Sequence, residues 1–234
     1  MRSCALEIMR RLNPMANQET SVPDGQLDIY GINKLRFLDI PYKRLVDMAR
    51  EIGIPQHELA LELWNSDQYE AKILSCILSD PAQLTEQQAD EWSQSLESWI
   101  ICEFCCGRML WQMPFALKKA VEWADGKLTT VRCAGFTLIA SIAANLPPGA
   151  ANELGFFDYS LFLARKHAAD ESIEVRRAVS PALQQIGKRG RDWYEAAVEA
   201  AEEIAAQPID AAKWVASQTL GELLSSRVAR TFAL

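Results

Sequence analysis

The sequence has few of the residues that common enzyme and metal-site motifs require. Its 234 residues include two histidines, His57 and His167, which lie too far apart in sequence for a zinc-ligand pair. It contains no glycine-rich phosphate-binding loop, no dinucleotide-binding glycine pattern and no G-x-S-x-G nucleophile motif. Classical kinases, dehydrogenases and serine hydrolases therefore have no support, and we expect neither a metal nor a cofactor.

Long apolar runs are also missing. No segment reaches the roughly 18 apolar residues of a membrane span, and the N-terminal MRSCALEIMRRL has too short an apolar run for a secretory signal. We therefore expect a cytoplasmic protein in which the six cysteines are free thiols. A single C-x-x-C runs from Cys102 to Cys105, and no second pair completes a zinc site. Cys102, Cys105 and Cys106 are expected to fill a helix–helix contact instead.

Period-two alternation of β-branched residues is nearly absent, so the sequence predicts an all-α fold. Thr85 with Gln88 predicts a capping box, and Ser172 predicts an N-cap. About eleven short helices joined by short loops indicate an α-solenoid of degenerate repeats or a plain bundle. We expect an N-terminal helix and polar loop over residues 1–29, and one helical-repeat domain over residues 30–234. The expected helices are Tyr42–Ile52, Gln56–Trp64, Tyr69–Leu78, Glu86–Ser95, Trp99–Leu110, Pro114–Trp123, Leu128–Ala144, Phe156–Ala168, Ile173–Ile186, Trp193–Ala205 and Ala211–Ser225.

Charge is unevenly distributed along a chain whose formal net charge is −7. From Ser160 to Arg191 seven Lys and Arg residues face three carboxylates, whereas after Arg191 seven carboxylates face three Lys and Arg residues. The basic stretch is compatible with two interpretations, solvated helix faces or a ridge that contacts phosphates. If it is a ridge, the DNA-contacting residues are Lys166, Arg176, Arg177, Lys188, Arg189 and Arg191.

Trp99 and Glu103 are four residues apart, so on a helix they share one side. An indole beside a carboxylate can bind a planar cation, because the ring offers a cation–π surface and the carboxylate a counter-charge. The structural alternative is a tryptophan at a packing interface next to a surface glutamate. The spacing alone leaves both open.

Pro181 falls in the middle of the predicted helix VRRAVSPALQQIGKR. Proline lacks the N–H of the helical hydrogen bond and its ring crowds the preceding turn. We therefore expect a kink or a split helix at this residue.

Several motifs, in order and at near-constant spacing from about Tyr30 to Phe232, resemble the bacterial DNA alkylation repair family, the alkylpurine DNA glycosylases built from HEAT-like repeats. They are YGIN (Tyr30–Asn33), HELALELW (His57–Trp64), SW..C..CCG (Ser98–Gly107), MPFA (Met113–Ala116), AGF.L.A (Ala134–Ala140), AVS.AL.QIGKR (Ala178–Arg189) and WVAS..L.EL (Trp214–Leu223).

The resemblance implies an α-solenoid whose concave groove holds duplex DNA and a monomer that cleaves the N-glycosidic bond of N3- or N7-alkylated purines. In that family an aromatic and acidic cleft stabilises positive charge that develops on the deoxyribose. Carried over by position, Glu103 supplies the carboxylate and Trp99 an aromatic wall. Glu103 stands where the family has an aspartate, and Arg132 is the backbone or phosphate clamp only if the helix register allows it.

Two further cleft positions depart from the family pattern. When the motif is matched to the family without a gap, Cys133 stands where the family has its functional arginine. Pro181 stands where the family has the third aromatic residue of the cleft. Gln184 replaces an arginine in the same motif. Three functions follow as hypotheses: a DNA glycosylase of altered activity, a non-catalytic DNA-binding paralogue that recognises DNA shape or branched or damaged structures, and an acidic protein-interaction solenoid.

Overall fold

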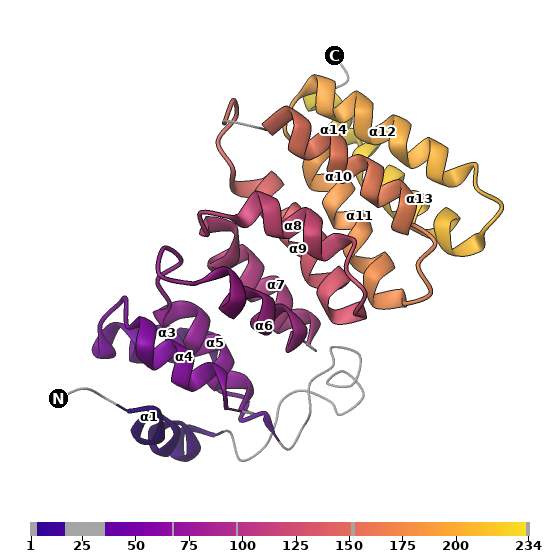
Figure 1. Ribbon diagram of the computed structural model, residues 1–234. Helices are drawn as coiled ribbons and strands as arrows, with labels where there is room; N and C mark the ends of the chain where they lie inside the picture. The colour runs from indigo at the N-terminus through magenta and orange to yellow at the C-terminus, as the bar shows by residue number, and fades with distance from the viewer. Residues whose placement is uncertain (1–3, 17–35, 67, 97, 151–152, 233–234) are drawn as a thin grey trace. The chain divides into compact units, whose positions relative to one another are not determined.

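The computed structural model describes residues 4–16, 36–66, 68–96, 98–150 and 153–232 (Figure 1). All of the regular structure in these ranges is helical, which confirms the all-α prediction. Residues 17–35 lie outside the described ranges, and with them the YGIN motif and most of the predicted polar loop. The helices divide between two compact units, one over residues 1–91 and 96–114, the other over 92–95 and 115–234. The single domain expected over residues 30–234 stays a prediction.

The first unit holds the helices before residue 115. In it α5 packs against α3, α4 and α7, and α1 packs against α4. Large side chains that are fully buried in this unit include Leu45, Leu63, Leu74 and Leu78. The helices are α1 (Ala5–Leu12), α3 (Tyr42–Ile52), α4 (His57–Trp64), α5 (Tyr69–Leu78), the first part of α6 (Glu86–Gln94) and α7 (Trp99–Arg108), with 3-10 turns at Asn13–Met15 and Leu110–Gln112.

The second unit is built of two helix layers. In the first layer α11 packs between α9 and α13. In the second layer α10 packs against α8 and α12. The two layers meet through the pairs α8–α9 and α12–α13. Phe136, Leu138 and Phe157 are fully buried between them. The helices are α8 (Ala116–Ala124), α9 (Thr129–Asn145), α10 (Glu153–His167), α11 (Ile173–Gly187), α12 (Arg191–Ala205), α13 (Asp210–Leu223) and α14 (Ser226–Phe232).

The predicted starts at Tyr42, Tyr69, Glu86, Trp99 and Ile173 are confirmed, and two predicted capping motifs are present. The Ser172 hydroxyl accepts from the backbone N–H groups of Glu174 and Val175, which makes Ser172 the N-cap of α11. Thr85 and Gln88 form the reciprocal capping box, with Thr85 N–H to Gln88 Oε1 at 2.9 Å and Gln88 N–H to Thr85 Oγ1 at 3.2 Å. Two details were not predicted: α10 begins at Glu153, and α14 follows α13.

Pro181 does not split its helix. α11 is continuous from Ile173 to Gly187 with Pro181 inside it, so of the two predicted alternatives the split helix is wrong, and the kink stays a prediction. Proline removes only one hydrogen bond, whereas buried residues on both sides of it, such as Val179 and Leu183, hold the helix against its neighbours.

The expectation of six free thiols is wrong for two of them. Cys76 of α5 and Cys105 of α7 form a disulfide across the contact between these helices, with their Cα atoms 5.6 Å apart. Cys102 and Cys106 are buried on α7 and are not in a disulfide, which agrees with the packing role predicted for the cysteines of this helix. Burial raises the pKa of the Cys106 thiol, and a hydrogen bond with Cys102 adds to the shift. Sequence spacing gave no signal for the disulfide, because its partners are 29 residues apart and meet only when α5 packs on α7.

No helix among the described residues is both long and apolar enough to cross a bilayer. Over the same ranges, no group of three or more His, Cys, Asp and Glu side chains is arranged to hold a metal ion.

Candidate functional site

Trp99 and Glu103 lie one turn apart at the start of α7. Trp99 is the first residue of the helix, after the N-cap Ser98, and is partly exposed, while Glu103 is exposed. Cys102 and Cys105 of the same helix are buried. An exposed carboxylate is solvated by water, so it stabilises a nearby cation much less than one in a closed, dry cleft would.

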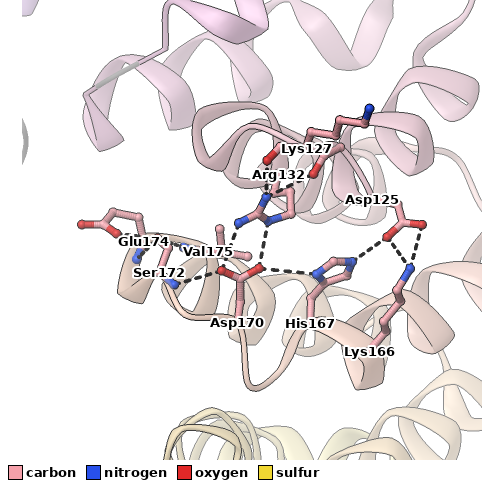
Figure 2. Close-up of polar contacts among 10 residues, drawn as sticks. Asp125, Lys127, Arg132, Lys166, His167, Asp170, Ser172, Glu174 and Val175 are labelled. Atoms are coloured by element: carbon pink, nitrogen blue, oxygen red, sulfur yellow. Dashed lines mark hydrogen bonds and ion pairs between the residues drawn. The ribbon is translucent and has the colours of Figure 1, made fainter.

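Arg132 of α9 is bound to Asp170 through a two-pronged ion pair (Figure 2). Its Nε lies 2.8 Å from one carboxylate oxygen of Asp170, and its Nη2 lies 3.2 Å from the other. Its Nη1 donates to the carbonyl oxygens of Gly126, at 3.2 Å, and Lys127, at 2.8 Å. The two side chains are 16% and 7% exposed. Every nitrogen of the guanidinium is thus engaged within the protein.

Asp170 is the centre of a wider polar cluster (Figure 2). It also accepts from the Ser172 backbone N–H at 2.9 Å, and His167 Nδ1 lies 3.5 Å from it. Burial opposes ionisation of Asp170, but the hydrogen bonds and charge of Arg132 outweigh it and hold the pKa below its usual range. The cluster therefore joins the N-terminal end of α9 to the turn between α10 and α11.

A second carboxylate, Asp125, extends the cluster to the end of α8. Its oxygens lie 2.7 Å from Lys166 Nζ and 2.8 Å from His167 Nε2. The hydrogen bond from Lys166 lowers the pKa of Asp125 most, and that of His167 adds to the effect. Lys166, predicted to contact DNA, is thus paired within the protein.

Three other cations of the predicted ridge also have carboxylate partners. Lys188 lies 2.6 Å from Glu222, and Arg191 lies 3.1 Å from Glu195 on the exposed side of α12. Arg189 is 5% exposed; it pairs with Glu153 and donates to the carbonyl oxygens of Ala143 and Leu146, 2.7 and 2.9 Å away. Its guanidinium also lies 4.7 Å from the centre of the Phe157 ring. Arg189 holds α10 against α9 and α11, so a phosphate would reach it only if this packing opened.

Arg176 and Arg177 are different. They are consecutive residues of α11, Arg177 is exposed and Arg176 is partly exposed. Within the described ranges no carboxylate lies at ion-pair distance from either guanidinium, although the nearby Glu174 carboxylate feels their charge. Among the six cations predicted to bind DNA, these two are the ones that have no carboxylate at ion-pair distance in the described ranges.

Comparison with known proteins identifies the family of this chain. A family model described as DNA alkylation repair enzyme matches residues 8–215. The chain belongs to the DNA alkylation repair family. The uncharacterized proteins Lin0241 of Listeria innocua serovar 6a and Lmo0209 of Listeria monocytogenes serovar 1/2a are 26% and 24% identical to it over 183 residues, which are 78% of this chain and 75% of each relative.

A solved structure shares the fold of this family member, with a TM-score of 0.76, 17% sequence identity, and coverage of 94% of this chain and 96% of the other. That structure is described as representing a new family of proteins related to the HEAT-like repeat DNA glycosylases with affinity for branched DNA structures. At this identity the likeness shows the fold, which confirms the predicted HEAT-like-repeat architecture.

The two altered positions of this DNA alkylation repair family member lie on α9 and α11 of the second unit. Cys133 is buried in α9 and is not in a disulfide, and Pro181 is partly exposed on α11. Gln184, one turn after Pro181, donates to Ser180 Oγ at 3.1 Å and to the Gln218 carbonyl oxygen at 3.0 Å, so it ties α11 to α13. None of these side chains offers an aromatic surface or a cation.

The residues that sequence analysis missed are the carboxylates that pair with the predicted cations. Asp125, Glu153, Asp170 and Glu222 meet their partners across 34 to 41 residues of sequence. No local spacing signals such pairs. The number of basic residues in a stretch of sequence therefore does not show how many of them can bind DNA, because their ion-pair partners are known only from the packed helices. The structure brings Trp99 and Glu103 together in the first unit and places Arg132 in the second.

Proposed function

We propose that this chain is a DNA-binding member of the DNA alkylation repair family that binds the phosphate backbone and does not excise alkylated purines. The observation that carries the proposal is the state of Arg132, whose nitrogens are all engaged by Asp170 and two carbonyl oxygens. These bonds use four of the five N–H groups of Arg132, and its side chain is only 16% exposed, so it stabilises the protein and offers little to a phosphate or a reacting sugar.

The other family positions support the same proposal. Pro181 removes an aromatic wall, a change that costs about 1–2 kcal/mol of cation binding in a dry site. Glu103 is exposed to water, where a carboxylate stabilises a developing oxocarbenium ion only weakly. The accessible pair of Trp99 and Glu103 on one side of α7 is the feature that favours the second candidate, excision of N3- or N7-alkylated purines from duplex DNA.

Branched DNA is the proposed preferred ligand, because the structural neighbour with the same fold is described as having affinity for it. Backbone binding suits such a target, since phosphate contacts read the path of the strands and carry no base sequence. Arg176 and Arg177 are the proposed contacts, because they are the predicted cations without an ion-pair partner at close range.

Replacing Arg176 and Arg177 together with alanine is expected to weaken binding to DNA of any sequence alike. The slope of log K against log salt should become shallower by about two, one for each phosphate contact that is lost. Fluorescence anisotropy with a labelled four-way junction and with a duplex of equal length, at several salt concentrations, measures both quantities.

The matched control is Arg191→Ala, which removes an exposed arginine that is already paired with Glu195. It should leave the slope unchanged. An unchanged slope in the Arg176→Ala/Arg177→Ala variant, or no binding of the wild-type protein to either DNA at physiological salt, would count against the proposal.

A further inference from the structure

The outward side of α10 exposes a cluster of apolar side chains. Leu154 is 71% exposed, Phe162 54% and Tyr159 47%. The rings of Tyr159 and Phe162 stack with their centres 5.7 Å apart and their planes 18° apart. Large aromatic side chains contribute strongly to protein interfaces, and a contiguous exposed group of them marks an interaction site rather than scattered surface residues.

Beside this cluster α10 packs against α12, and the surface along their contact, with the cavity at its start, is called the groove. At the start of both helices a cavity of about 420 Å³ opens, with Leu154 and Trp193 among its apolar walls. At their other ends the helices are joined by an ion pair between Arg165 and Glu203. The two helices therefore run parallel, and helical spacing places Phe162 on the groove side of α10 between Asp158 and Arg165. The cavity is lined by Leu154, Asp158, Gly190, Arg191, Asp192, Trp193 and Ala196.

The α12 side of the groove is acidic. One side of α12 carries Asp192, Ala196, Glu199 and Glu203, which follow one another at spacings of four, three and four residues. The three carboxylates therefore form one ridge along the helix. All three carboxylates are exposed, and Asp158 adds a fourth on the α10 side. Arg165 is paired with Glu203, and Arg191 is paired with Glu195, so the carboxylates that remain for a partner are those of Asp158, Asp192 and Glu199.

We propose that this groove, formed by α10 and α12, docks a basic amphipathic segment of a partner protein. The apolar side chains of the segment pack on Tyr159, Phe162 and the cavity, and its Lys or Arg side chains pair with the α12 ridge. An uncharged apolar segment would leave Asp158 and the ridge carboxylates desolvated without partners, which is costly. DNA phosphates would be repelled by the same carboxylates, whereas a cationic segment satisfies them.

The groove is separate from the proposed DNA contacts. Arg176 and Arg177 belong to α11, in the other helix layer of this unit, while α10 and α12 form the layer that carries the acidic and aromatic side chains. The α12 ridge contains three of the seven carboxylates that follow Arg191 in the sequence.

The test uses the full chain and two fluorescein-labelled helical peptides of about 14 residues. One has Leu and Phe on one side and Lys on the other, and in the second every Lys is Glu. We expect the Lys peptide to bind with a Kd in the micromolar range and the Glu peptide not to bind. Tyr159→Ala with Phe162→Ala should weaken binding at least tenfold, and Glu199→Lys about tenfold, while affinity for DNA stays unchanged in both.

Matched controls separate the groove from general surface charge and apolarity. Leu128 is 53% exposed in the same unit but lies before α9, and Glu171 is an exposed carboxylate outside α10 and α12, so Leu128→Ala and Glu171→Lys should bind the Lys peptide as the wild type does. Three outcomes would overturn the proposal: equal weakening by the control variants, binding of both peptides alike, or loss of DNA affinity in the Tyr159→Ala/Phe162→Ala variant. A dimer in sedimentation that this variant dissociates would assign the groove to a second copy and overturn it as well.

Discussion

Replacing Arg132 with alanine is expected to lower the free energy of unfolding by about 3 kcal/mol and to leave DNA affinity unchanged where the variant is folded. The change leaves Asp170, whose side chain is 7% exposed, without its main partner, and breaking a buried ion pair from one side costs this much. Urea unfolding measures the stability, and anisotropy below the unfolding temperature measures the affinity.

The pH dependence of the stability difference between the wild type and Arg132→Ala provides a second test of the ion pair. Arg132 holds the pKa of Asp170 below its usual range, so the ion pair contributes stability that is present above the unfolded pKa of about 3.9 and is lost as the pH falls through the folded pKa. The unfolding free energies of the wild type and Arg132→Ala should therefore converge below about pH 4. Arg177→Ala, an exposed cation on α11, should change stability little at any pH. A stable Arg132→Ala protein with much weaker DNA binding would show that Arg132 is a phosphate clamp after all.

Gly135→Ala is expected to destabilise the second unit by about 3 kcal/mol or to prevent its folding. A Cβ atom at this position would lie 2.1 Å from the backbone nitrogen of Ala124 and 2.5 Å from its Cα atom. Because these are backbone atoms of α8, they cannot move aside as a flexible side chain would, and α8 and α9 would have to separate. The contact explains the glycine in the AGF motif. Thermal unfolding followed by circular dichroism measures the effect.

The control for this prediction is a glycine-to-alanine change that should raise stability. Gly221 lies in α13, and a Cβ atom there would meet no atom within 4 Å. Gly221→Ala should raise stability by up to about 1 kcal/mol, because alanine favours a helix more than glycine does. Equal stabilities of the Gly135→Ala and wild-type proteins would contradict the close packing of α8 on α9.

Local features of the fold were predictable from sequence because their causes are local. The Thr85–Gln88 capping box, the Ser172 N-cap and the bounds of α3 and α5 depend on residues within one or two turns. Pro181 is an exception to this local predictability. The proline disturbs only the hydrogen bonding of its own turn, whereas the buried neighbours along α11 stabilise the helix on both sides, so the helix continues.

The candidate site was less predictable, because its state depends on contacts between distant helices. The motif order identified the family, and the spacing of Trp99 and Glu103 placed them on one side of α7. Sequence could not show that Arg132 is engaged by Asp170, or that Arg189 is buried against Glu153, because both pairs form only after α9, α10 and α11 pack. The acidic partners, rather than the basic residues, decide which cations are available to DNA.

Release of alkylated bases is the measurement that tests the central claim most directly. Wild-type protein at micromolar concentration is incubated with methylated duplex DNA under conditions where anisotropy shows that the DNA is bound, and the free bases are quantified by mass spectrometry. The account predicts DNA binding with no 3-methyladenine or 7-methylguanine above the level without protein. Release of either base that Glu103→Ala abolishes would contradict it, and would make this chain a glycosylase that works without the third aromatic wall.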